Sequence, residues 1–112
     1  MAPDFYIRRG DRTNPIRRTL VDFDGNPIDL VTRTVRFYMT NALTGATVVN
    51  GVVITPVDAV NGVVQYEWEP GTTDVAGNYL AEFQTTDSEG RAETFPNVGY
   101  IEIEISKRAT DV

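Results

Sequence analysis

The sequence predicts an all-β protein, an immunoglobulin-like β-sandwich of about seven antiparallel strands. Short runs of alternating apolar and polar residues recur along the chain, and turns that contain glycine or proline separate them. No segment long enough for a helix has apolar residues at a helical period. The 112 residues are enough for one domain that buries a core without disulfides.

Within each run the apolar residues share one parity, which gives every expected strand a buried face and a solvated face. Asn61-Gly62 predicts a two-residue hairpin turn, whose central residues both need φ > 0. Gly51 interrupts the valine-rich fourth run and predicts a bulge or a break into two strands. In chain order the expected strands are 5–9, 15–21, 33–40, 47–55, 64–69, 77–83 and 100–106.

Polar turn residues and one tyrosine add detail to this fold. We expect a turn at 22–25 in which Asp22 caps backbone amides, and a hairpin turn at 87–90. The spacing Gly77-x-Tyr79-x-Ala81 is similar to an immunoglobulin tyrosine corner, so a buried Tyr79 needs a backbone partner for its hydroxyl. The expected core consists of Val35, Phe37, Tyr66, Trp68, Tyr79, Phe83, Ile101, Ile103 and Ile105.

The composition argues against an enzyme and against a metal or cofactor site. The chain has neither cysteine nor histidine, so disulfides, thiolate sites and the most usual general base are excluded. Its two serines, Ser88 and Ser106, have no histidine to activate them. The start of the chain lacks the features of a signal peptide and no run is long enough to span a membrane. We expect a soluble protein that is made in the cytoplasm.

Two acidic patterns invite a chemical interpretation, and neither fits it. The pairs Glu67/Glu69 and Glu102/Glu104 lie on solvated strand faces, where catalytic carboxylates would lack the cleft that raises a pKa. Asp22-x-Asp24-x-Asn26 begins like a calcium loop. The sixth and twelfth positions of that loop hold Pro27 and Arg33 instead of glycine and glutamate, so we expect no calcium site.

Charge is spread unevenly along the chain. Residues 1–40 carry seven arginines and five carboxylates, whereas residues 41–106 carry one arginine and ten carboxylates. Residues 107–112 add two cations and one carboxylate, which gives the net charge of −6. If strands from the two halves of the chain interleave in the fold, much of this charge difference averages out over the surface. Alternatively, an acidic face and an arginine-bearing face meet between neighbouring subunits of an assembly.

Several motifs follow one another in a fixed order: Gly10-Asp11, the segment 22–30, Val35-x-Phe37-x-Met39, the segment 61–83, Phe95-Pro96-Asn97 and 100–103. Together they resemble the N-terminal immunoglobulin-like domain of phage baseplate upper proteins. The resemblance covers about 4–106 and implies a virion structural module of the tail, baseplate or capsid surface that docks onto a larger symmetric assembly. It implies other virion proteins as partners, several copies or a homo-oligomer, and a virion location. The chain is then either a stand-alone relative or one domain of a longer protein.

One basic cluster near the N-terminus is the candidate partner-binding surface. We expect residues 1–14 to form a partly extended arm, 15–106 the sandwich and 107–112 a tail. The cluster is either a solvated arginine face or a docking surface, because arginine pairs bidentately with carboxylates of a partner. The negative net charge and the few neighbouring aromatic residues argue against nucleic acid. The candidate residues are Phe5, Tyr6, Arg8, Arg9, Arg12, Arg17 and Arg18.

A second function class stays open. A β-sandwich of this kind could bind a carbohydrate or a host-surface glycan, which requires exposed aromatic side chains gathered in one patch. Tyr6, Tyr38 and Tyr100 have the outward parity of their expected strands. Binding of a polysaccharide would distinguish this class from a purely structural module.

Overall fold

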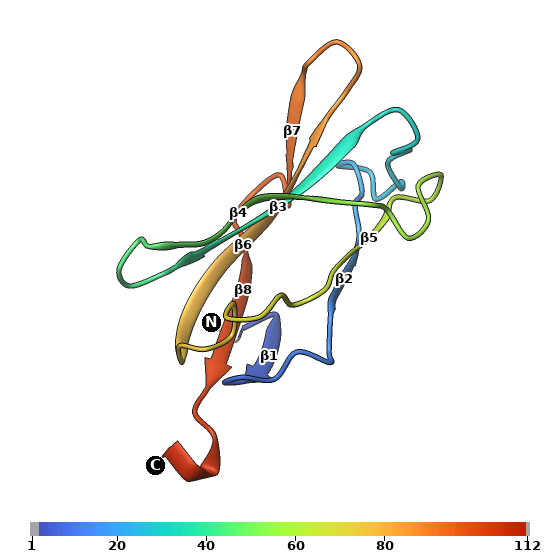
Figure 1. The fold of residues 1–112 in the computed structure, drawn as a ribbon. Helices are drawn as coiled ribbons and strands as arrows, with labels where there is room; N and C mark the ends of the chain where they lie inside the picture. The colour runs from blue at the N-terminus through green and yellow to red at the C-terminus, as the bar shows by residue number, and fades with distance from the viewer. Residues whose placement is uncertain (1–2, 112) are drawn as a thin grey trace.

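A computed structural model describes residues 3–111 and confirms the all-β sandwich (Figure 1). Met1 and Ala2 of the expected arm and Val112 of the expected tail lie outside this range. The described chain holds eight strands and one short 3₁₀ turn, η1. In chain order they are β1 (Phe5–Arg8), β2 (Ile16–Thr19), β3 (Thr34–Asn41), β4 (Thr47–Ile54), β5 (Val63–Tyr66), β6 (Gly77–Thr86), β7 (Ala92–Phe95), β8 (Ile101–Ser106) and η1 (Ala109–Asp111).

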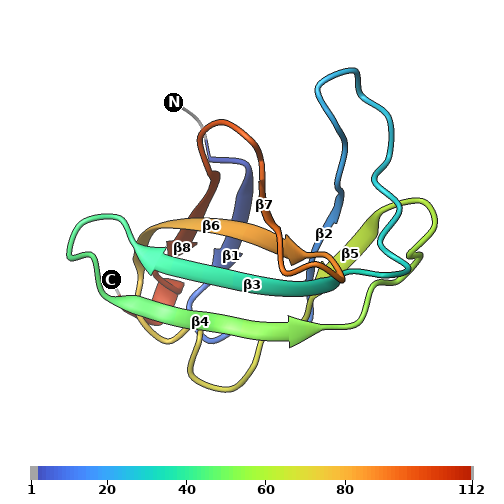
Figure 2. The ribbon, with the colours of Figure 1, turned by 90° about the horizontal axis from the view of Figure 1, so that it is seen from above.

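Six strands form a large sheet, and β2 pairs with β5 in a small sheet that faces it (Figure 2). The large sheet has the order β1-β8-β6-β3-β4. The long strand β6 is flanked on one side by β3, and on the other by β8 along its first half and by β7 along its second half. The molecule is elongated, 48 Å by 26 Å by 22 Å, so its two ends are distinct surfaces.

Two features of the sheet differ from the expectation of about seven antiparallel strands. The expected turn at 87–90 is confirmed, and it leads into an additional short strand, β7, that pairs back onto β6. All strand pairs are antiparallel except β1 and β8, which run parallel. A parallel pair joins strands that are distant in sequence, so no local turn signal announces it.

The turn before β5 is longer than predicted. Gly62 has φ = +72°, but Asn61 does not have a positive φ, so the prediction of a two-residue turn is wrong. The loop spans four residues between Asp58 and Val63, which form a bridge. The Asp58 carboxylate accepts hydrogen bonds from the backbone and side chain of Asn61, and this stabilises the wider loop. A Cβ on Gly62 would lie 2.8 Å from the carbonyl oxygens of Leu20 and Ile28, so only glycine fits there.

Gly51 forms a bulge within a continuous β4, which is one of the two outcomes expected for it. The register passes from Phe37–Val52 to Tyr38–Asn50 and omits Gly51, whose φ is +73°. The ring of Tyr38 lies over this position, 3.0–3.1 Å from where a Cβ would stand.

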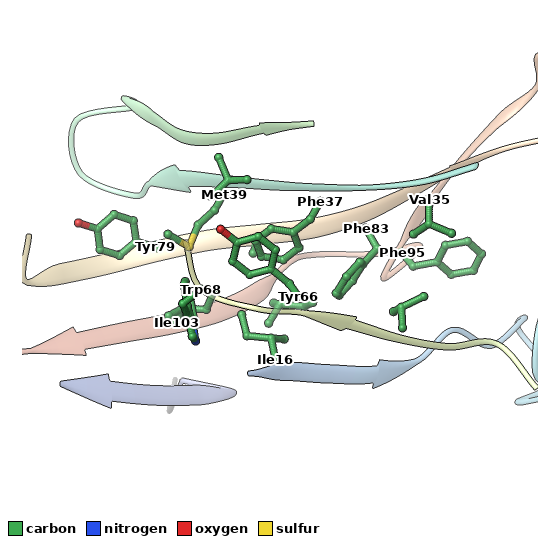
Figure 3. Packing of buried hydrophobic residues seen from close by; sticks show 14 of the residues in the cluster. Ile16, Val35, Phe37, Met39, Tyr66, Trp68, Tyr79, Phe83, Phe95 and Ile103 are labelled. Atoms are coloured by element: carbon green, nitrogen blue, oxygen red, sulfur yellow. The ribbon is translucent and has the colours of Figure 1, made fainter. Parts of the chain in front are cut away.

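The core lies between the two sheets, and all nine residues expected there are buried (Figure 3). Phe37 of the large sheet stacks on Tyr66 of the small sheet, with ring centroids 4.2 Å apart. Trp68 meets Tyr66 edge-on at 5.3 Å, and its indole N–H donates to the backbone carbonyl of Asn14 at 2.8 Å. Aromatic contacts of this kind therefore join the two sheets.

Side chains satisfy backbone groups at two expected places. The hydroxyl of Tyr79 donates to the backbone carbonyl of Val75 at 2.6 Å, as expected for a tyrosine corner. Asp22 Oδ1 accepts from the backbone N–H groups of Asp24 and Asn26, both at 2.9 Å. One oxygen of the carboxylate that could have started a calcium loop therefore accepts hydrogen bonds within its own turn.

Candidate functional site

The chain segments that follow β1 and β8 lie side by side, because the parallel pairing sets Arg8 opposite Ser106. The guanidinium of Arg9 donates two hydrogen bonds to the carboxylate of Asp111, both 2.7 Å long. The guanidinium of Arg8 donates to the backbone carbonyl of Lys107 at 2.9 Å. Figure 1 shows the C-terminal segment at one end of the molecule. We call this region the basic end, and define it by Arg8, Arg9, Arg12, Lys107 and Arg108 together with Asp11 and Asp111.

One ion pair ties the two segments of the basic end together. Asp111 accepts the two hydrogen bonds from Arg9 and a third from the backbone N–H of Arg108 at 2.9 Å. These hydrogen bonds lower the pKa of Asp111 to about 2, and the same contact raises the pKa of Arg9. The positive charge of Arg9 is therefore largely neutralised within the domain.

Three of the other four cations of the basic end have no ion-pair partner among the described residues. Arg8, Arg12 and Lys107 form no ion pair there, whereas Arg108 lies 3.8 Å from Asp11. Arg8, Lys107 and Arg108 line one shallow hollow. The end thus presents positive charge on a chain whose net charge is −6.

The remaining sequence-predicted candidates occupy different environments. Phe5 faces inward and packs on Trp68, with ring centroids 5.9 Å apart, so it supports the core. Tyr6 points outward from β1 and is 56 % exposed. Arg17 is exposed on β2, while Arg18 is half-buried and donates to the backbone carbonyl of Arg17 at 2.9 Å. The structure thus groups Tyr6, Arg8, Arg9 and Arg12 on and just after β1, and leaves Arg17 and Arg18 on the small sheet.

Sequence reasoning missed Lys107 and Arg108 as members of this cluster. They were expected in a tail, but the parallel register of β1 and β8 carries them beside Arg8 and Arg9. No local pattern reveals that register, since β1 and β8 are separated by most of the chain.

The acidic residues of the later strands stay largely unpaired with the N-terminal arginines. Arg33–Glu93, at 3.1 Å, is the single ion pair among the described residues that joins residues 1–40 to residues 41–106. Interleaving of strands therefore does little to pair the two kinds of charge directly. Carboxylates without an ion-pair partner among the described residues include Glu67, Glu69, Glu82, Glu102 and Glu104.

An apolar groove of about 360 Å³ lies between the segment 18–23 and the segment 95–98, with Phe83 and Ile101 at its base. Figure 2 shows the segment after β2 and the segment after β7 on the same side of the molecule. Two large apolar side chains of these segments face solvent: Phe23 is 87 % exposed and Val98 is 80 % exposed.

Two of the three outward tyrosines share a depression on the outer face of the large sheet. Tyr38 stands opposite Glu82 in the β3–β6 register, and Tyr100 directly precedes β8. Both tyrosines line a depression of about 270 Å³ with Thr40, Leu80 and Glu82. Tyr6 is not among its lining residues.

Within residues 3–111, no three histidine, cysteine, aspartate or glutamate side chains gather as metal ligands. In the same range, no helix is long and apolar enough to cross a membrane.

Comparison with protein families identifies the chain. The family model described as the BppU N-terminal domain matches residues 2–101. The chain belongs to the BppU N-terminal domain family. The expected resemblance to the N-terminal domain of phage baseplate upper proteins is confirmed. A search of curated proteins gives no match.

A solved structure supports the fold of this BppU N-terminal domain. The chain is similar to the N-terminal domain of phage TP901-1 ORF48, with a TM-score of 0.66 and 20 % sequence identity. The match covers 92 % of this chain and 84 % of that one. Together with the family, this makes the protein a baseplate-associated structural domain of a phage, and other virion proteins are its partners.

Proposed function

We propose that this domain is a non-enzymatic structural module that docks onto a larger symmetric assembly in the baseplate, in several copies, through its basic end. The observation that carries the proposal is the meeting of cations from both chain ends on one surface, where Arg8, Arg12 and Lys107 form no ion pair within the described residues. Positive charge that is not paired within the domain attracts carboxylates of neighbouring molecules and orients them as they approach.

The basic end is also ordered before it meets a partner. The Arg9–Asp111 ion pair joins the segment after β1 to the segment after β8, and the hydroxyl of Thr73 donates to the backbone carbonyl of Asp11 at 3.0 Å. A surface held in place in the free domain loses less conformational entropy on binding. Arg8 and Arg12 are then presented to carboxylates of a partner with their guanidinium groups largely free.

The lack of histidine and cysteine supports a non-enzymatic role, since the most usual general base and the thiol nucleophile are missing. The Tyr66 hydroxyl, which has no hydrogen-bond partner among the described residues, is enclosed in the core and cannot meet a substrate.

Charge reversal at the basic end tests the proposal. Arg8→Glu combined with Arg12→Glu should lower the number of domains per purified particle by about tenfold or more. Arg36→Glu with Arg91→Glu is the matched control, because both lie outside the basic end and the charge changes equally. Binding by the unaltered domain should weaken as salt rises, since exposed charges are screened beyond about 8–10 Å. Undiminished occupancy of the double variant would place the attachment surface elsewhere.

Substitution is a better test than removal of residues 1–14. Ile7 is buried in the core, β1 covers the edge of β8, and the Asn14 carbonyl accepts the hydrogen bond from Trp68. Deletion would therefore remove a strand and core contacts, and a loss of binding would have two explanations.

Binding of a glycan is a second candidate, favoured by the depression that Tyr38 and Tyr100 share with Glu82. Aromatic faces with a nearby carboxylate suit a sugar ring, which has both apolar C–H faces and hydroxyl groups. Host cell-wall polysaccharide should then be retained by the domain, and Tyr100→Ala should lower that retention. Tyr6→Ala, which alters an exposed tyrosine outside the depression, is the control. Equal retention by both variants would rule this site out.

A further inference from the structure

We propose that the apolar groove beside β2 is a second interface, which accepts an extended strand of another virion protein along the free edge of β2. The proposed strand carries apolar residues and a carboxylate that meets Arg18. This interface is distinct from the basic end and goes beyond the docking proposed for it.

The end of β2 borders the groove. Residues 18–23 line it: Arg18 and Thr19 are the last two residues of β2, and residues 20–23 continue the chain past the strand. Within residues 3–111, β2 pairs only with β5. The wall of the groove therefore includes the end of a strand whose second edge is unpaired within those residues.

The hydrogen bonds around β2 show which backbone groups are free. Leu20 N–H donates to the carbonyl of Gly62, and Leu20 C=O accepts from Ile28 N–H, so both groups of Leu20 point toward the small sheet. Backbone groups alternate sides along a strand, so those of Arg17 and Thr19 point away from β5. These groups form the short ladder to which an added strand can pair.

One side chain of the domain covers this ladder in the free state. The guanidinium of Arg18 donates to the carbonyl of Arg17 at 2.9 Å, which occupies an outward-facing acceptor. Exposed edge strands are commonly protected by charged side chains in this way. The contact uses one of five guanidinium donors, so Arg18 retains capacity for a carboxylate.

The chemistry of the groove defines the partner strand. Phe83, Phe95, Pro96, Val98 and Ile101 make the opposite wall and base apolar, and the exposed Phe23 and Val98 extend the apolar surface to the rim. Arg18 and Asp22 are the charged residues of the lining, and the Asp22 carboxylate already caps its own turn. Arg18 is the one cation of the lining, so it can pair with a carboxylate that stands next to an apolar residue of the partner strand.

Two variants test the interface in the intact chain, with particle occupancy as the readout. Arg18→Glu should lower the number of domains per particle by about tenfold or more, because it repels the carboxylate. Arg36→Glu makes the same charge change on β3, away from the groove, and should leave occupancy unchanged. Thr19→Pro removes an outward N–H without breaking the β2–β5 ladder, and should have the effect of Arg18→Glu.

The outcomes separate this interface from the basic end. Folding of each variant is checked by its melting temperature, and Arg18→Glu still decides the matter if Thr19→Pro fails to fold. Equal occupancy for Arg36→Glu and Arg18→Glu contradicts the proposal, whatever the basic-end variants do. If the isolated domain self-associates and Arg18→Glu abolishes that self-association, the groove binds a second copy of this domain. That result would also overturn the proposal that another virion protein occupies the groove.

Discussion

Two buried tyrosines differ in what their hydroxyl groups contact. Tyr79 donates to Val75 at 2.6 Å, whereas the Tyr66 hydroxyl has no hydrogen-bond partner among the described residues, and burial raises the pKa of Tyr66. Tyr79→Phe should therefore lower the free energy of unfolding by about 1–2 kcal/mol. Tyr66→Phe keeps the stack on Phe37 and should leave stability unchanged or slightly higher. Urea denaturation of both variants measures the free energy of unfolding. An equal loss of stability in the two variants would contradict the hydrogen bonding described for the two hydroxyl groups.

Trp68 joins three separate parts of the chain within the core. It contacts Phe5 and Tyr66 and donates to Asn14. Trp68→Ala should cost roughly 3–5 kcal/mol of unfolding free energy, because it leaves a cavity and an unpaired carbonyl. Trp68→Phe should cost less, since most of the apolar contact remains. A Trp68→Ala variant as stable as the parent would mean that the core is packed differently.

Residues whose environment is set by their neighbours in sequence could be predicted. Alternation assigned the buried face of each strand, and the short Asp22 side chain reached the amides of its own turn as expected. The prediction failed at Asn61, because the turn there depends on the Asp58 side chain and on the backbone of Leu20 and Ile28 against Gly62. The contacts of Gly62 come from a segment distant in sequence.

At the scale of elements, the segment after β8 is held to the segment after β1 by Asp111. Its pKa in the folded domain, about 2, lies below the ordinary value of 3.8, so ionised Asp111 favours the folded state. This contribution is complete above about pH 4 and is lost as the pH falls through about 2.

Asp111→Asn tests the tether. The variant should melt at a lower temperature than the parent at pH 5–7, and the difference should disappear toward pH 2 as the parent carboxylate becomes protonated. Thermal melts across this range measure the effect. A difference that stays constant down to pH 2 would mean that ionised Asp111 does not hold the segment.

Strands were easier to predict than their pairing. The apolar alternation of the seven expected strands is a local property, and each of them is present with small shifts at its ends. Strand β7 is only four residues long, with Glu93 and Thr94 half-buried, so its alternation is too short to stand out. The parallel partnership of β1 and β8 depends on the whole sheet, and no residue pattern within either strand encodes it.

At the scale of the whole molecule, charge is divided along the chain: residues 1–40 and 107–112 carry an excess of cations, and residues 41–106 carry an excess of carboxylates. The sequence showed the arginine excess of residues 1–40, so half of the basic end could be predicted from Arg8, Arg9 and Arg12. Lys107 and Arg108 could not, because the fold brings them there through β8. The apolar groove was likewise beyond prediction, since its walls come from segments about 75 residues apart in sequence.

A cryo-electron microscopy map of the parent particle tests the central claim most directly. We expect several symmetry-related copies of this domain in the baseplate, each with Arg8, Arg12 and Lys107 buried against carboxylates of a neighbouring protein or copy. The outer face of β3 and β6 should stay clear of that contact. Copies whose basic end faces solvent while another surface makes the contact would contradict the account.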